Sequence, residues 1–258
     1  MKRRLATILF VASAAAVAAF SSGPPNGATG APGEAVCTDC HSSFPVNSGT
    51  GSLSVSGLPQ TYIPGMAYTV TVNLADPNAR RWGFEATAKA NGKPGGVIAV
   101  TDAARTQLSQ ASSGLQYIKH TSQGTDAGKT SSDSWTFSWT APAAGTGPVT
   151  FYAAGNAANG DGTPSGDHIY TTSVSVPEGA AIVYGDVTGD GLLTIADVTL
   201  ALQFAVQLRQ PTPAQLQAAD VAPTPGIDGR PFGDGVITVA DVLRMLRRVI
   251  GLDTGPWP

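Results

Sequence analysis

The chain has 258 residues and a formal net charge of −3, and only 13% of its residues are charged. Ordinary soluble domains carry about 25% charged residues, and here Gly, Ala, Ser, Thr and Pro take their place. This composition excludes a coiled coil or a helical bundle over most of the chain, and the absence of an extended basic patch excludes a nucleic-acid binder.

The N-terminus has the pattern of an export signal. Met1-Lys2-Arg3-Arg4 precedes an apolar run from Leu5 to Phe20 that is too short for a stable membrane span, and Ala16-Val17-Ala18 offers a cleavage site. We predict a signal peptide over residues 1–21 and a secreted protein, extracellular or at the cell surface, with the periplasm as the other compartment. An uncleaved anchor is the alternative. No membrane span is expected after signal cleavage.

Residues 22–36 are rich in Gly, Pro and Ala without periodicity, and we predict a linker over residues 22–51. It contains Cys37-Thr38-Asp39-Cys40-His41, with the only two cysteines of the chain. This pattern predicts covalent haem c, since two thiols add across the haem vinyl groups and the adjacent His ligates the iron. The alternatives are a Cys37–Cys40 disulfide and a zinc site, which needs further ligands. The candidates for a second iron ligand are His120, His168 and Met66.

Residues 52–177 alternate between apolar and polar side chains with a period of two. Examples are Val70, Val72 and Leu74, and then Trp135, Phe137 and Trp139, with Gly- and Pro-rich turns between the runs. The pattern predicts a mainly β fold, an Ig-like antiparallel β-sandwich with Trp and Phe in its core.

The stretch from residue 30 to residue 176 resembles bacterial Reelin N-terminal-like β-sandwiches of the choice-of-anchor V family. The resemblance implies a Reelin-like sandwich followed by a surface-attachment module, and it implies no catalysis. The motifs that carry it, besides Cys37-x-x-Cys40-His41, are Gly30-Ala31-Pro32-Gly33-Glu34, Gly57-Leu58-Pro59, Tyr62-x-Pro64-Gly65, Arg81-Trp82-Gly83-Phe84, Tyr117-Ile118-Lys119-His120-Thr121, Trp139-x-Ala141-Pro142, Ala154-Gly155-Asn156-Ala157-Ala158-Asn159-Gly160 and Gly166-Asp167-His168-Ile169-Tyr170.

After a second predicted linker, residues 178–184, an internal repeat spans residues 185–253, and residues 254–258 form a short tail. Residues 189–208 align with 233–252, and each copy is a Gly-Asp loop followed by a helical pattern. The predicted apolar faces are Val198, Ala201, Leu202, Ala205 and Leu208 in the first copy and Val242, Met245, Leu246, Val249 and Leu252 in the second. Two such helices must pack on each other, which predicts a small α domain.

The loops of the repeat match an EF-hand-like calcium loop, because hard Ca²⁺ takes roughly six to eight oxygen ligands and Gly permits the sharp turn. The predicted oxygen donors of the first site are Asp186, Thr188, Asp190, the Leu192 carbonyl and Asp197; those of the second are Asp220, Asp234, the Val236 carbonyl and Asp241. Asp220 fills the first position only if about ten residues are inserted after it. Helix capping by Thr194-x-x-Asp197 and Thr238-x-x-Asp241 is the alternative.

The two loop–helix repeats resemble a type I dockerin. The resemblance implies two Ca²⁺ ions and docking onto a cohesin-type partner, often in assemblies that degrade polysaccharides. Loop positions 10 and 11, often hydroxylic in that family, are Ile195-Ala196 and Val239-Ala240 here. A self-contained stalk, or packing against the sandwich, is the alternative to cohesin docking.

Three functions follow from these features. The first is an exported, non-catalytic two-module protein with a haem-bearing sandwich and a calcium-dependent attachment module. The second is an extracytoplasmic c-type cytochrome with a redox partner. The third is a carbohydrate-binding or polysaccharide-degrading component with a dockerin. Because Glu85 stands alone in its strand and no Ser–His–Asp arrangement is evident, we do not expect an enzyme.

Overall fold

The computed structural model describes residues 20–180, 182–224, 226, 232–255 and 257. Most of the predicted signal peptide, and parts of the second linker, the insertion and the tail, lie outside these residues. The chain divides into two compact units, and Pro177–Pro258 belongs to the second. Among the described residues, none of the helices has the length and apolar character that crossing a bilayer requires.

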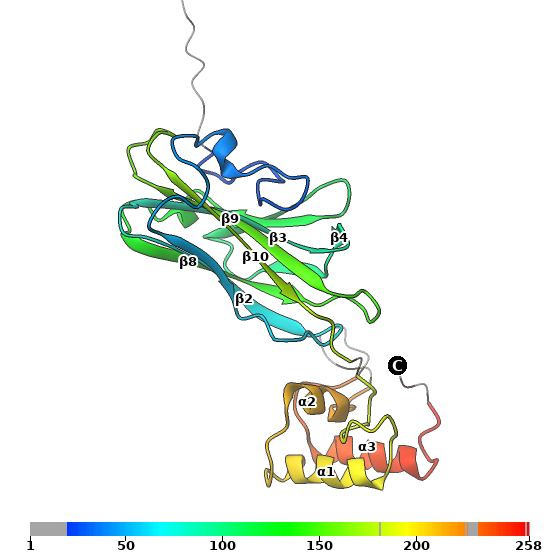
Figure 1. The fold of residues 1–258 in the computed structure, drawn as a ribbon. Coiled ribbons are helices and arrows are strands. Elements are labelled where there is room, and N and C mark those ends of the chain that lie inside the picture. The colour runs from blue at the N-terminus through cyan, green and yellow to red at the C-terminus, as the bar shows by residue number, and fades with distance from the viewer. Residues whose placement is uncertain (1–19, 181, 225, 227–231, 256, 258) are drawn as a thin grey trace, which may run out of the picture. The chain divides into compact units, whose positions relative to one another are not determined.

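The first unit is built from antiparallel strands in two sheets (Figure 1). One sheet has the order β1-β2-β8-β5, and the other has the order β10-β9-β3-β7-β6 with β4 beside β3. The strands are β1 (Ser52–Ser56), β2 (Ala67–Asp76), β3 (Arg81–Ala90), β4 (Lys93–Pro94), β5 (Val97–Val100), β6 (Thr106–Gln110), β7 (Gln116–His120), β8 (Ser131–Thr140), β9 (Val149–Ala158) and β10 (His168–Val176), with short 3₁₀ turns η1 (Cys37–Asp39) and η2 (Gln123–Thr125).

Aromatic side chains join the two sheets. Phe84 of β3 stacks on Trp135 of β8 with ring centroids 4.5 Å apart, and Phe151 of β9 meets Trp139 of β8 edge-on at 4.9 Å. These rings are almost fully buried, so they form the core between the layers. The prediction of a mainly β, antiparallel sandwich with a Trp and Phe core is confirmed.

Residues 22–51 do not form the loose linker that their composition suggested. This segment lies over the outer face of the six-stranded sheet (Figure 1), and its Ala28, Thr29 and Ala31 are buried. Strand β3 is consequently covered on both faces, and Glu85 and Thr87 are as inaccessible as Phe84 and Ala86, the apolar residues that precede them. The segment lacks periodicity because side chains of the sheet, and not an apolar face of its own, hold it in place.

The C-terminal region forms three helices, α1 (Ile195–Ala205), α2 (Pro213–Ala219) and α3 (Val239–Val249). α1 and α3 are the two predicted helices of the repeat, and α2 was not predicted. Val198, Ala201, Val242 and Met245 are buried in one core as expected, together with Phe204, which the prediction omitted.

Three residues of the predicted apolar faces are exposed instead, namely Leu202, Leu208 and Leu252. Leu208 and Leu252 lie beyond the ends of their helices, at Ala205 and Val249. Phe204 belongs to the inward face because it lies three residues after Ala201.

A buried polar contact ties β10 to β2. The Tyr170 hydroxyl donates to Asp76 Oδ2 at 2.6 Å and accepts the Gly51 N–H at 2.9 Å. Replacing Tyr170 with Phe removes a donor from a carboxylate that is 1% exposed. We expect Tyr170→Phe to lower the free energy of unfolding by about 1–3 kcal/mol, measured by urea denaturation. Tyr152→Phe, on the neighbouring strand β9, is the matched control and should change it little; equal effects would contradict this assignment.

Candidate functional site

The Cys-x-x-Cys-His motif forms a single tight turn. Cys37–Asp39 is one turn of 3₁₀ helix, and the N–H groups of Cys40 and His41 both donate to the Cys37 carbonyl, at 3.2 and 3.0 Å. Cys37 and Cys40 are free thiols in the structure. Burial raises the pKa of the Cys37 thiol to about 12. The turn therefore presents two thiol groups beside one imidazole.

His41 is held by residues from distant parts of the chain. Its Nδ1 lies 2.7 Å from Asp167 Oδ2, and the Asp167 side chain is 1% exposed. Asn156 of β9 contacts the same ring, with its Nδ2 3.3 Å from both Nδ1 and Nε2. A carboxylate on Nδ1 fixes the orientation of an imidazole and leaves Nε2 as the nitrogen that can bind a metal.

His120 ends β7 and enters the site from the sheet. Its Nδ1 lies 2.9 Å from the Phe84 backbone nitrogen and 3.0 Å from the Phe84 carbonyl oxygen. Burial lowers the pKa of His120, so the ring is neutral at physiological pH. Gly83 makes room for it, since a Cβ at that position would lie 2.9 Å from His120 Cε1.

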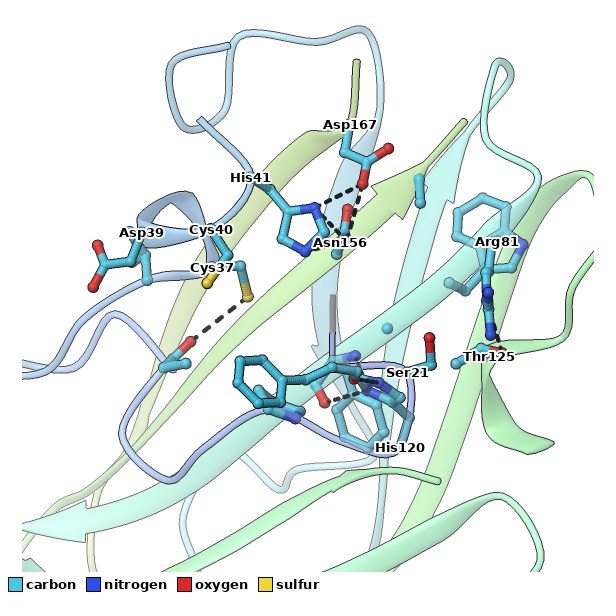
Figure 2. Close-up of a pocket in the computed structure, with 18 of the residues that line it drawn as sticks. Ser21, Cys37, Asp39, Cys40, His41, Arg81, His120, Thr125, Asn156 and Asp167 are labelled. Atoms are coloured by element: carbon cyan, nitrogen blue, oxygen red, sulfur yellow. Dashed lines mark hydrogen bonds and ion pairs between the residues drawn. The ribbon is translucent and has the colours of Figure 1, made fainter. Parts of the chain in front are cut away.

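These groups line one cavity with an empty volume of about 1040 Å³, including its open mouth. Figure 2 shows His41 and His120 bordering the same space, with the Cys37 and Cys40 sulfur atoms beside His41. Much of the remaining wall is apolar, which suits a flat hydrophobic ligand. The apolar lining residues are Phe20, Pro24, Pro25, Ala28, Ala35, Val36, Trp82, Phe84 and Ala158, and Arg81 also contributes.

The structure thus brings together four of the five predicted cofactor residues: Cys37, Cys40, His41 and His120. His168 is not among the residues that line the cavity; its ring stacks on Phe44 at 4.2 Å. Met66 does not line it either.

Sequence reasoning missed Asp167, Asn156 and Arg81 as parts of the site. One signal could have identified these three residues: each lies in a sequence motif that carries the resemblance to Reelin-like domains.

The N-terminal wall of the cavity depends on a buried carboxylate. Glu85 Oε2 accepts the Ala28 N–H at 2.6 Å, and the Lys119 ammonium lies 3.6 Å from Glu85 Oε1. Lys119 also donates to the Pro24 carbonyl and to Asn26 Oδ1, both at 2.7 Å. These contacts fix the segment that leads to the Cys37 turn.

The first predicted calcium loop is organised by two carboxylates. Asp186 accepts the N–H groups of Gly189, Asp190 and Gly191 at 2.7–3.0 Å. Asp197 is completely buried and accepts backbone N–H groups from both ends of the loop, those of Val187, Thr188 and Thr194. Asp190 accepts the Leu192 N–H.

The second loop repeats this pattern despite its insertion. Asp220 accepts the N–H groups of Asp234 and Gly235, as Asp186 does in the first loop, and buried Asp241 takes the place of Asp197. Asp234 accepts the Val236 N–H. Asp220 therefore accepts loop N–H groups in the second copy as Asp186 does in the first, and its role as a calcium ligand stays a prediction.

Both helices that follow these loops carry the predicted capping boxes. Thr194 with Asp197 caps α1, and Thr238 with Asp241 caps α3. Among the residues that the structure describes, no group of three or more His, Cys, Asp or Glu side chains is arranged to hold a metal ion. The capping alternative is thus seen directly, and calcium at Asp186, Thr188, Asp190, Leu192 and their counterparts stays a prediction.

Comparisons with known proteins give similarities of structure alone. No family model and no curated protein matches the chain. The human F-spondin reeler domain is 23% identical with a TM-score of 0.36, covering 50% of this chain and 89% of its own. The Reelin-N domain of F-spondin is 22% identical with a TM-score of 0.39, covering 55% and 97%. A cohesin module from a Clostridium perfringens family 33 glycoside hydrolase is 14% identical with a TM-score of 0.35, covering 50% and 96%. No functional residue is carried over from them.

The Glu85 anchor predicts a pH dependence of stability. Burial raises the pKa of Glu85 from 4.5 to about 7, against the opposing effects of the Ala28 N–H and Lys119. Because the folded-state pKa is the higher one, this group's contribution is present at acidic pH and is lost as the pH rises from about 4.5 to 7. Relative to Glu85→Gln, the wild type should lose up to about 3 kcal/mol of unfolding free energy over this range, measured by urea denaturation.

The matched control is Glu178→Gln. Hydrogen bonds from the Gly147 and Gly145 backbone lower the pKa of Glu178, which is half-buried. The difference in unfolding free energy between the wild type and Glu178→Gln should therefore change in the opposite direction, because the wild type gains stability as the pH rises. Parallel pH profiles of Glu85→Gln and wild type would contradict the buried anchor.

Proposed function

We propose that this chain is an exported, non-catalytic protein whose sandwich carries a covalent c-type haem and whose C-terminal region attaches it through calcium. The observation that carries the haem assignment is the cavity bordered by Cys37, Cys40, His41 and His120, with buried Asp167 on His41 Nδ1. A local disulfide or a zinc site gives no reason for an apolar cavity at the motif.

The residues present fit the group. Cys37 and Cys40 would form its thioether links, and His41 would ligate the iron through Nε2. Asp167 would keep the imidazole oriented and raise its basicity. Arg81, a cation in the cavity wall, would pair with the acidic propionates. Such a group supplies one-electron chemistry and ligand binding at iron.

Two roles are compatible with such a site. Electron transfer to a redox partner, as in an extracytoplasmic cytochrome, is favoured by the open mouth of the cavity beside the motif. A carbohydrate-degrading role is disfavoured because the described strand carboxylates, Asp76, Glu85 and Asp133, are all buried and cannot reach a sugar. Polysaccharide degradation is retained only as the context in which a dockerin-like module would place the protein.

The C-terminal unit would bind two calcium ions and dock onto a cohesin-type partner. Support comes from the matching hydrogen bonds of Asp186 and Asp220 in loops of different length. Exposed apolar residues at equivalent positions of the two repeats offer a docking surface: Leu192 and Val236, Ile195 and Val239, Leu208 and Leu252. Secretion to the cell surface or medium suits both modules, since haem attachment to thiols and millimolar calcium belong outside the cytoplasm.

The haem assignment is tested by expressing the full chain with a cytochrome c maturation system. We expect a Soret band, and a mass increase equal to one haem that persists after denaturation and acid–acetone extraction. Cys37→Ala/Cys40→Ala should lose the covalent haem and keep the β-sheet circular dichroism. A chain without haem that carries a Cys37–Cys40 disulfide would overturn the proposal.

The calcium assignment is tested by thermal unfolding with calcium and with a chelator. Because ligand binding stabilises only the folded form, calcium should raise the melting temperature and the chelator should reverse the effect. Asp190→Asn/Asp234→Asn is the informative variant. Each Asn still accepts the N–H two residues on, so metal-free stability should persist while the calcium response falls at least tenfold in apparent affinity. If calcium leaves the melting temperature of the wild type unchanged, these loops serve only as helix caps.

A further inference from the structure

The cavity offers one strong iron ligand besides His41. The chain has three His residues, and His41 and His120 line the cavity whereas His168 does not. No Met is among the described residues that line it, and the two Cys side chains would be consumed by the thioether links. The second ligand therefore has to be His120 or a small molecule.

The hydrogen bonds of His120 leave the correct nitrogen for this task. Its Nδ1 is engaged by the Phe84 backbone at 2.9–3.0 Å, which holds the ring against Gly83. Metal-binding imidazoles typically have one nitrogen held by the protein in this way and the other on the metal. In addition, His120 is the last residue of β7, and the preceding residue, Lys119, is paired with Glu85 of β3 in the sheet. The sheet therefore gives the His120 ring a rigid support.

The remaining nitrogen has a partner that processing would remove. His120 Nε2 lies 3.4 Å from the Phe20 carbonyl oxygen, and Phe20 belongs to the predicted signal peptide of residues 1–21. Phe20 also forms part of the cavity wall. In a chain cleaved after residue 21, both the carbonyl and the ring of Phe20 are gone, and Nε2 loses this contact.

We infer that His120 is the second axial ligand of the haem iron, binding through Nε2 opposite His41, and that removal of Phe20 with the signal peptide frees it. The inference rests on the proposed haem function. It makes the mature protein a bis-histidine, six-coordinate haem protein, which favours electron transfer over the binding of an exogenous ligand at iron.

The test compares ferric spectra and electron paramagnetic resonance of the secreted, processed protein and its variants. The N-terminus is first verified by mass. Wild type should be six-coordinate and low-spin. His120→Asn keeps a polar group near the Phe84 backbone but cannot reach the iron, so it should convert the haem almost completely to the high-spin, five-coordinate form. Added imidazole should restore the low-spin spectrum, which a purely structural defect would not allow.

Matched controls are His168→Asn and Met66→Leu, which should remain low-spin. His120→Met, which still offers an iron ligand, should give a low-spin spectrum distinct from that of the wild type. Covalent haem with an unchanged low-spin spectrum in His120→Asn, or a high-spin wild type, would overturn this inference alone. Absence of covalent haem in every variant would overturn the proposed function and this inference with it.

Discussion

A carboxylate inside a protein must be paired or hydrogen-bonded, because an unpaired buried charge costs several kcal/mol. Among the described residues, the buried acidic side chains all accept backbone N–H groups, and several of those N–H groups belong to loops. These carboxylates are Asp76, Glu85, Asp133, Asp167, Asp197, Asp220 and Asp241. Glu85 holds the N-terminal segment against the sheet, and Asp167 holds both the Asn159 loop and His41. The position of the Cys37 turn, and hence the cavity, depends on these two contacts.

The sandwich was predictable because its strands bury one face each, and that geometry leaves a period of two in the sequence. The N-terminal segment was not. Its backbone is bonded by Glu85, Lys119 and Gln107 of the sheet, and no local pattern records such partners. For the same reason the two-sided burial of β3 was unexpected: Glu85 and Thr87 look solvent-facing until a covering segment is placed over them.

The candidate site was only partly predictable from the sequence, because some of its residues are adjacent in the chain and others are brought together only by the fold. Cys37, Cys40 and His41 lie within five residues of one another, so the motif that carries the proposed haem chemistry can be recognised in the sequence alone. Asp167 lies 126 residues from His41, and its hydrogen bond depends on the tertiary fold. The choice among His120, His168 and Met66 likewise required the cavity. In the C-terminal repeat, by contrast, spacing alone made Asp220 the counterpart of Asp186, and the two carboxylates make equivalent hydrogen bonds to their loops.

The few acidic residues of this chain are used in part as hydrogen-bond acceptors for backbone N–H groups of its loops. A Thr-, Ser- and Gly-rich chain forms long loops whose N–H groups need acceptors, and a buried carboxylate can serve two or three of them at once. Asp197 accepts N–H groups from both ends of its loop, and Asp167 accepts the Asn159 N–H and contacts the His41 ring. Both proposed sites would therefore be preorganised before their ligands arrive. In each site the ligand would also contact a group outside these hydrogen bonds, namely Asp190 in the calcium loop and His120 Nε2 in the cavity. Substitutions at these two positions should therefore weaken ligand binding without unfolding the protein.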